Sequence, residues 1–129
     1  MSKMMDALEA PAMVFEIECV GPDGQVKWRE TVRNLVMTAG KTDIIDKYLK
    51  GSAYTAAWYL ILKGAGSIAA GDTLASHAGW TEVTPYAGNR PGITWGTTSG
   101  GSNTATAVSI SINATATVAG AGCCTVNTG

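Results

Sequence analysis

The chain has no charged residue after position 90. All nine lysines and arginines and all ten aspartates and glutamates lie at or before Arg90, and only Glu82 and Arg90 lie beyond Asp72. Residues 91–129 are polar but uncharged, so no electrostatic repulsion keeps this part of the chain away from neighbouring molecules. Their regularly spaced apolar residues are not typical of a disordered tail. We therefore expect part of the surface formed by residues 91–129 to be covered by another protein chain.

The net charge of the whole chain is also small. A formal charge of −1 excludes the general attraction of basic proteins to nucleic-acid phosphates and to anionic membranes. The first residues include a lysine but no long apolar run, so they predict neither a signal peptide nor a membrane anchor. We expect a protein made in a cytoplasm, with no direct nucleic-acid partner and no membrane.

Cysteine and histidine are scarce. Three cysteines without a C-x-x-C spacing and a single histidine favour neither a zinc site nor a disulfide framework, and reduced thiols are the simpler interpretation. Catalysis by His77 would need an orienting carboxylate, for which only Asp72 and Glu82 are near, and no G-x-S-x-G turn is present. The sequence therefore predicts that the protein is not an enzyme and binds neither a metal nor a cofactor. The cysteines are Cys19, Cys123 and Cys124.

The length of 129 residues suits one domain. Residues 1–12 place Met4, Met5 and Leu8 in a short polar setting, which is typical of a flexible arm that orders on a partner. We therefore expect an N-terminal arm over 1–12 and a single β-sandwich domain over 13–129.

Four segments in the first two thirds of the chain predict regular structure. A Pro-Asp-Gly turn between two apolar runs predicts a hairpin over 14–32. Residues 42–50 have helical spacing, with Thr42 as N-cap, one apolar face and Gly51 just beyond the end. The apolar run 56–62 predicts a central strand buried on both faces, and 80–83 a further strand. The predicted apolar helix face consists of Ile44, Ile45, Tyr48 and Leu49.

Residues 107–118 alternate between apolar and hydroxyl-bearing side chains. This period of two predicts a strand with one face in the core and the other lined by uncharged polar groups. Exposed sheet faces and edges usually carry charge against association, so this face is a candidate contact surface, with an ordinary solvated face as the alternative. Its side chains are Ser109, Ser111, Asn113, Thr115 and Thr117.

The stretch 75–96 gathers His77, three aromatic residues and two prolines. One interpretation is a structural corner, in which turns are shaped by the prolines and anchored by aromatic side chains in the core. The alternative is an exposed platform of Trp80, Tyr86 and Trp95 that binds a sugar or a peptide. We favour the corner. Its residues are His77, Trp80, Pro85, Arg90, Pro91 and Trp95.

Four blocks between residues 33 and 121 resemble small virion proteins of tailed bacteriophages. They read NLVMTAGK at 34–41, SAYTAAWY at 52–59, DTLASHAGWTE at 72–82 and RPGITWG at 90–96. The chain is most similar to the capsid cement, or decoration, proteins of short-tailed phages, and it departs from the pattern after Gly122. The resemblance implies a β-sandwich or jelly roll that binds the outer face of the head shell, and it carries over no catalytic residue.

Both lines of reasoning lead to one expectation. The protein is predicted to be mainly β, a single sandwich or jelly-roll domain with one short α-helix. Its expected function is to decorate and stabilise the outer capsid surface of a virion through contacts with the major capsid protein and with copies of itself. A homodimer is preferred over a trimer because isologous pairing is the commonest closure. The alternative is a tail-fibre-associated receptor- or glycan-binding module.

Overall fold

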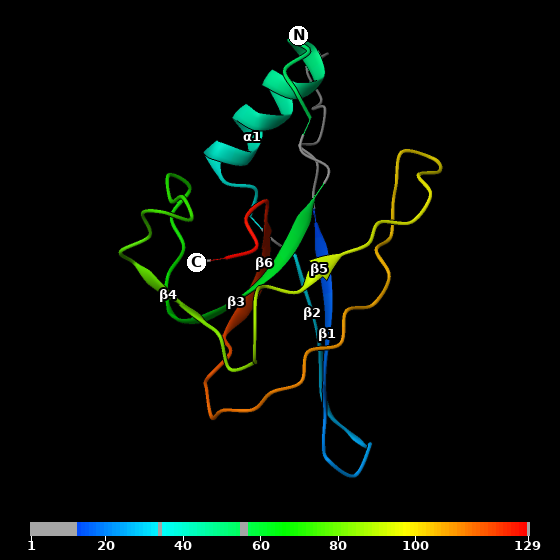
Figure 1. Cartoon of the computed structure of the whole chain (residues 1–129), viewed down its shortest axis with the longest axis vertical. Helices are drawn as coiled ribbons and strands as arrows, with labels where there is room; N and C mark the ends of the chain where they lie inside the picture. The colour runs from blue at the N-terminus through cyan, green and yellow to red at the C-terminus, as the bar shows by residue number, and fades with distance from the viewer. Residues whose placement is uncertain (1–12, 34, 55–56, 129) are drawn as a thin grey trace, which may run out of the picture.

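The computed structural model describes residues 13–33, 35–54 and 57–128, which form two sheets and one short helix (Figure 1). The predicted mainly-β fold with one short helix is confirmed, and the two sheets are compatible with a jelly roll. The predicted arm, with Met4, Met5 and Leu8, lies outside the described residues. The elements in chain order are β1 (Val14–Val20), β2 (Val26–Arg33), α1 (Thr38–Ile44), η1 (Ile45–Leu49), β3 (Trp58–Gly66), β4 (Trp80–Val83), β5 (Gly92–Ile93) and β6 (Gly120–Cys124).

The hairpin β1–β2 forms the smaller sheet, as the sequence predicts. Its turn is closed by hydrogen bonds from Gly24 N–H to Gly21 O (2.9 Å) and from Gly21 N–H to Gln25 O (2.8 Å). Gly24 has a φ of 76°, which a residue without Cβ adopts at little cost. Most of β2 is exposed, including Trp28, so this hairpin presents apolar side chains to solvent rather than a fully covered face.

The larger sheet is built around β3, which is central as predicted but begins at Trp58 and continues to Gly66. β6 pairs with residues 59–63 along one edge. β4 and β5 both lie on the opposite edge, because Leu62 pairs with β4 as well as β6 and Tyr59 with β5 as well as β6. The prediction that β3 is buried on both faces is wrong, since only Ile61 and Gly64 are buried.

The predicted strand over 107–118 is wrong. This segment makes no ladder in the described structure, and it passes from the region after β5 to β6 as an irregular connection (Figure 1, orange). Its half-buried residues are Val108, Ile110 and Val118, whereas residues 111–117 are all exposed. Both edges of β3 are already occupied by β4, β5 and β6, so the segment has no free edge of that strand to join.

The helix begins at Thr38, and its N-cap is Met37 and not the predicted Thr42. The Thr38 N–H donates to Ala70 O (2.9 Å), a contact with a distant loop that holds the first turn in place. α1 continues directly into the π-helical segment η1 and ends before Gly51, which has a φ of 72°. The predicted position of the C-terminal glycine is therefore confirmed. No residue of α1 or η1 is buried, so the predicted apolar residues of the helix remain exposed.

The core is small and lies where β3, β4 and the segment 84–91 meet. The buried large hydrophobic side chains of the described residues are Ile61, Trp80 and Tyr86. Tight backbone approach also defines this region, because a Cβ at Gly66 would lie 2.1 Å from Gly79 O. The segment that the sequence predicts to be a structural corner is thus a principal part of the core.

Candidate functional site

Residues 84–91 form a loop, here called the excursion, that leaves one edge of the larger sheet and returns to the same edge. The preceding strand β4 and the following strand β5 both pair antiparallel with β3, so the chain leaves that edge after Val83 and returns to it at Gly92. Pro91 O accepts a hydrogen bond from Leu60 N–H (2.8 Å), which fixes the point of return. Loops with closely spaced ends are frequent sites of function, because the sheet positions them rigidly.

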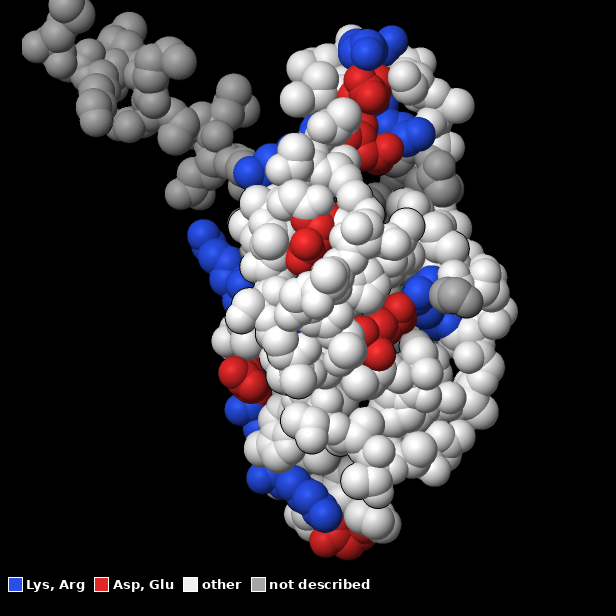
Figure 2. Space-filling view, turned by 90° about the vertical axis from the view of Figure 1, so that its left-hand side faces the viewer, with Lys and Arg blue, Asp and Glu red and all other residues white. Residues whose placement is uncertain are grey.

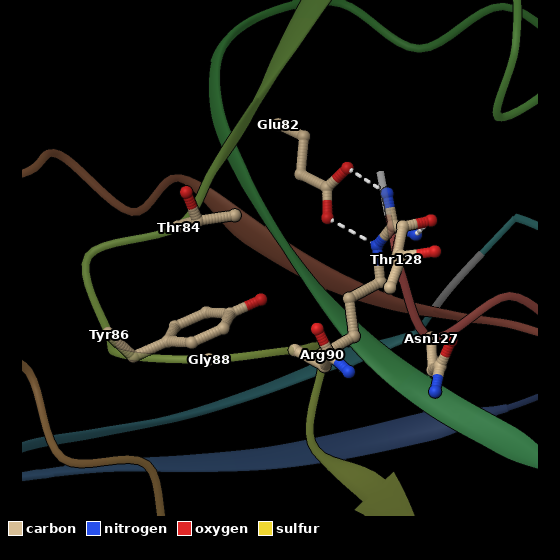
Figure 3. Close-up of a pocket in the computed structure, with 8 residues that line it drawn as sticks. Glu82, Thr84, Tyr86, Gly88, Arg90, Asn127 and Thr128 are labelled. Carbon is tan, nitrogen blue, oxygen red and sulfur yellow. Dashed lines mark hydrogen bonds and ion pairs between the residues drawn. The ribbon is translucent and has the colours of Figure 1, made fainter.

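A buried ion pair closes this excursion. The Arg90 guanidinium donates from Nε to Glu82 Oε1 and from Nη2 to Glu82 Oε2, both at 2.7 Å (Figure 3). The remaining Nη1 donates to Val126 O (3.1 Å) and Thr128 O (2.6 Å). Arg90 N–H also donates to Asn127 O (2.9 Å). Arg90 therefore joins β4, the excursion and the segment after β6 in one network.

The sequence places Arg90 in the corner 75–96, and its hydrogen bonds extend beyond this corner to Val126 and Thr128. The two side chains are 4% (Arg90) and 14% (Glu82) exposed, and the hydrogen bonds that Arg90 donates to Glu82 raise the pKa of Arg90 above its ordinary value. One sequence signal could have revealed the pair. Glu82 and Arg90 are the only charged residues after Asp72, and in an otherwise uncharged region each is the other's nearest counter-ion in sequence.

An open pocket of about 450 Å³ lies beside the ion pair, and Figure 3 shows Tyr86 directed into it. Among the described residues the buried Tyr86 hydroxyl has no hydrogen-bond partner. Burial raises the pKa of Tyr86, and the Glu82 carboxylate adds to this shift, so the phenol is neutral at pH 7. Because the ion pair is internally neutral, the pocket suits uncharged polar groups. Its lining comprises Glu82, Thr84, Tyr86, Gly88, Asn89, Arg90, Asn127 and Thr128.

His77 serves the loop before β4. Its Nδ1–H donates to Trp80 O (3.0 Å), and its ring stacks on the Trp80 indole with centroids 4.0 Å apart. The carboxylate of Asp72 accepts from Trp80 Nε1 (3.1 Å) and from Ala69 N–H (2.8 Å) instead of orienting the histidine. The other carboxylate considered, Glu82, is paired with Arg90. The described geometry thus assigns His77 a structural contact within this loop.

The remaining predicted corner residues divide into two groups. Pro85 is buried and its carbonyl accepts from Asn113 N–H (2.8 Å), while Pro91 is half-buried at the end of the excursion. Trp95 is 38% exposed, so the expectation that it anchors the core is wrong. It belongs to an irregular hairpin over 94–106, in which it bridges to Ala105. The platform of three tryptophan and tyrosine rings does not form either, because Trp80 and Tyr86 are buried.

The structure places part of the predicted hydroxyl-lined face against this corner. Ser109, Ser111 and Asn113 line a second, smaller hollow of about 240 Å³ together with Tyr86 and Pro91. Thr115 and Thr117 do not line it, although both are exposed. Tyr86 and Asn89 line both this hollow and the larger pocket, so the two hollows are neighbours at the excursion 84–91.

We call the exposed part of residues 91–128 the uncharged surface. It comprises the hairpin 94–106, the connection 107–119 and the segment after β6, and it carries no lysine, arginine, aspartate or glutamate. On the face shown in Figure 2 charged side chains lie at the top, along the left side and at the lower end, with a few near the centre, and the lower right part of the face is uncharged.

Other chemistry is limited in the described residues. They contain no group of three or more histidine, cysteine or acidic side chains placed to hold a metal ion. Cys19, Cys123 and Cys124 are free thiols, and burial raises the pKa of Cys123 to about 11. No described helix is both long and apolar enough to cross a membrane.

The chain was compared with protein-family models, curated proteins and solved structures. No protein-family model, no curated protein and no solved structure matches the chain. These comparisons therefore neither support nor contradict the resemblance of the four sequence blocks to small virion proteins.

Proposed function

We propose that the protein is a structural component of a bacteriophage virion that decorates the outer capsid surface and stabilises the shell. The proposed partners are the major capsid protein and further copies of this chain, and no catalytic step is involved. The protein is made in the host bacterial cytoplasm and ends on the outside of the virion. The proposal rests on the resemblance of the four sequence blocks and on the surface described above.

The observation that carries the proposal is the uncharged surface next to a rigid corner. A soluble protein normally places charge on its exposed segments, which limits unwanted association. Here the exposed residues of 91–128 carry none, while the adjoining loop is held by the buried Glu82–Arg90 pair. A neutral surface on a fixed support is suited to a contact that is repeated many times with the same geometry.

Repetition explains how modest contacts can stabilise a shell. Each copy on a closed shell has neighbours at fixed positions, so release of one contact leaves the others in place and rebinding is fast. We place Ser109, Ser111 and Asn113 at the contact, with Thr115 and Thr117 at its margin. Neutral contacts of this kind depend little on salt, because no ion pairs are screened.

The test is co-sedimentation of the purified protein with mature heads, isolated tails and host envelope at moderate and high salt. Saturable binding to heads that persists at high salt is expected. Ser111→Lys is expected to weaken head binding at least about tenfold, since it brings an unpaired charge into the contact. Ser67→Lys is the matched control, because Ser67 is exposed and lies outside the uncharged surface. Binding to envelope or tails alone would refute the proposal.

One observation favours a second candidate function, a tail-fibre-associated receptor- or glycan-binding module. The pocket beside Tyr86 offers amide, hydroxyl and aromatic groups without net charge, which is the chemistry that binds neutral sugars. Titration of the protein with host surface glycans, followed by NMR, tests this candidate. Shifts centred on Asn89 and Asn127 that saturate with glycan would favour it over capsid decoration.

A further inference from the structure

The pocket beside the Glu82–Arg90 pair contains two hydrogen-bond donors that lack an acceptor among the described residues. The first is the buried hydroxyl of Tyr86, a residue that is 9% exposed, and Figure 3 shows its oxygen on the side of the ion pair. Burial and the Glu82 carboxylate raise the pKa of Tyr86, so at pH 7 the phenol keeps its proton and is a donor. Buried polar groups are normally paired, so an unpaired one indicates a missing partner.

The second donor belongs to Arg90. A guanidinium has five N–H groups. Four of them are paired, because Nε and Nη2 each donate to Glu82 at 2.7 Å and Nη1 donates to Val126 O and Thr128 O. The second N–H of Nη2 has no acceptor within the described part of the chain. This side chain is 4% exposed, so the donor lies where polar groups are normally paired.

Two unpaired donors in one pocket call for an oxygen that accepts without donating. A carbonyl oxygen has two lone pairs and no hydrogen, whereas a hydroxyl brings a further hydrogen that needs its own acceptor. An anion would also accept, but Glu82 already neutralises Arg90 and would repel it. The described lining contains no second basic side chain. The pocket therefore suits a neutral carbonyl group.

The rim of the pocket supplies the other groups that an amide needs. Thr84, Asn89, Asn127 and Thr128 are exposed, and their side chains form no hydrogen bond within the described residues. These side chains can therefore turn aside at little cost and admit a ligand to the buried phenol. The two asparagine Oδ1 atoms can accept from an amide N–H. The lining thus offers donors for the C=O of an amide and acceptors for its N–H.

We propose that this pocket binds N-acetylated sugars and takes the carbonyl of the acetamido group at the Tyr86 hydroxyl. The proposal rests on the second candidate function, and it deepens that function by naming the class of glycan. A volume of about 450 Å³ lies in the lower part of the range of small-ligand pockets, which suits one sugar unit better than an extended peptide. A sugar without the acetamido group leaves both donors without a carbonyl partner.

The test is NMR titration of the full chain, with the backbone amide resonances of Asn89 and Asn127 as the readout. N-acetylglucosamine is expected to bind at least about tenfold more tightly than glucose, because only the former carries the carbonyl. Tyr86→Phe removes the hydroxyl alone and is expected to weaken N-acetylglucosamine binding at least about tenfold, with glucose binding unchanged. Tyr48→Phe is the matched control, because Tyr48 is 86% exposed and does not line the pocket, and it is expected to bind like the wild type.

Urea denaturation of Tyr86→Phe separates loss of binding from loss of the fold. The variant is expected to keep the wild-type midpoint, since the hydroxyl that it removes has no partner in the ligand-free protein. A clear loss of stability would show that the Tyr86 hydroxyl is already paired, and it would overturn the proposal.

The titrations also separate this proposal from the function on which it rests. Equal affinities for N-acetylglucosamine and glucose, or full binding by Tyr86→Phe, would overturn it. Tighter binding of N-acetylglycine N-methylamide than of the sugar would also overturn it, because the pocket would then serve a peptide. If host glycans bind at this pocket without preference for the acetamido group, the second candidate function stands and this proposal fails. If no glycan binds, both fail, and capsid decoration is still decided by co-sedimentation with heads.

Discussion

Replacement of Glu82 by glutamine is expected to destabilise the fold by about 3 kcal/mol. The carboxylate accepts two hydrogen bonds of 2.7 Å from Arg90, and the guanidinium is 4% exposed. Glutamine retains one acceptor but turns an amide N–H₂ toward an Arg90 donor, which leaves a buried cation without its counter-ion. Removal of one partner from a buried pair costs about 3–5 kcal/mol, and the adjacent open pocket favours the lower end.

The assay is urea denaturation followed by circular dichroism, with a thermal melt as a second measure. A loss of 3 kcal/mol corresponds to a fall in Tm of about 10 °C for a domain of this size. Glu18→Gln is the matched control, because it breaks the Glu18–Arg29 pair, whose side chains are 42% and 66% exposed. Exposed pairs of this kind contribute about 0.5 kcal/mol or less.

The double variant Glu82→Leu/Arg90→Met separates charge from packing. It removes both charges, so no buried ion lacks a partner, and it is expected to recover much of the stability that Glu82→Gln loses. The carbonyls of Val126 and Thr128 lose their donor in this variant, so recovery is incomplete. If Glu82→Gln and Glu18→Gln have equal effects, the buried pair does not stabilise the corner and the reasoning is wrong.

Two further predictions concern the β3 region. Burial raises the pKa of Cys123 to about 11 from an ordinary 9.0, so at pH 8 iodoacetamide should modify it about 100-fold more slowly than an ordinary exposed thiol, as mass spectrometry can measure. The contribution of the neutral Cys123 thiol to the stability of the fold is fully present below pH 9 and is lost as pH rises through about 11. Rapid alkylation of Cys123 in the folded protein would contradict the raised pKa. Gly66→Ala should cost at least about 2 kcal/mol in urea denaturation, because φ is 99° and the new Cβ would meet Gly79 O. Gly71→Ala, with open space around its Cβ, is the control, and equal losses would refute the argument.

Elements specified by local signals could be predicted from the sequence. The Pro-Asp-Gly turn and the flanking alternation were sufficient for the hairpin β1–β2, and the bounds of β4 were predicted correctly. The centrality of β3 followed from its continuous apolar run. Each of these features depends on residues close together in the chain.

Elements that depend on distant partners could not be predicted. The alternation of 107–118 describes one segment only, and a strand also needs an unoccupied edge, which depends on where β4, β5 and β6 pair. The start of α1 is held by the Thr38–Ala70 hydrogen bond, while the local sequence favoured a cap at Thr42. A local pattern therefore indicates which conformation a segment favours, and the whole fold decides whether that conformation is used.

Most of the candidate site also depends on distant contacts. The sequence predicted that the Trp80 side chain lies in the core, and Trp80 is buried. It did not reveal that Arg90 reaches residues 126–128, a separation of 36–38 positions that no local rule covers. The exposure of Trp95 was missed because Trp95 pairs with Ala105 in the hairpin 94–106, and local sequence patterns do not identify this partner.

The interrupted edge of the larger sheet has a consequence for how such a protein can vary. β4 and β5 take their registers independently from the same strand, β3, so the length of the segment between them sets neither register. The entropy of closing a loop rises slowly with its length. The tip at Gly88, with a φ of 85° and open space around it, is therefore a position where residues can be inserted or exchanged without rebuilding the sheet. New binding specificities could arise there by loop replacement alone.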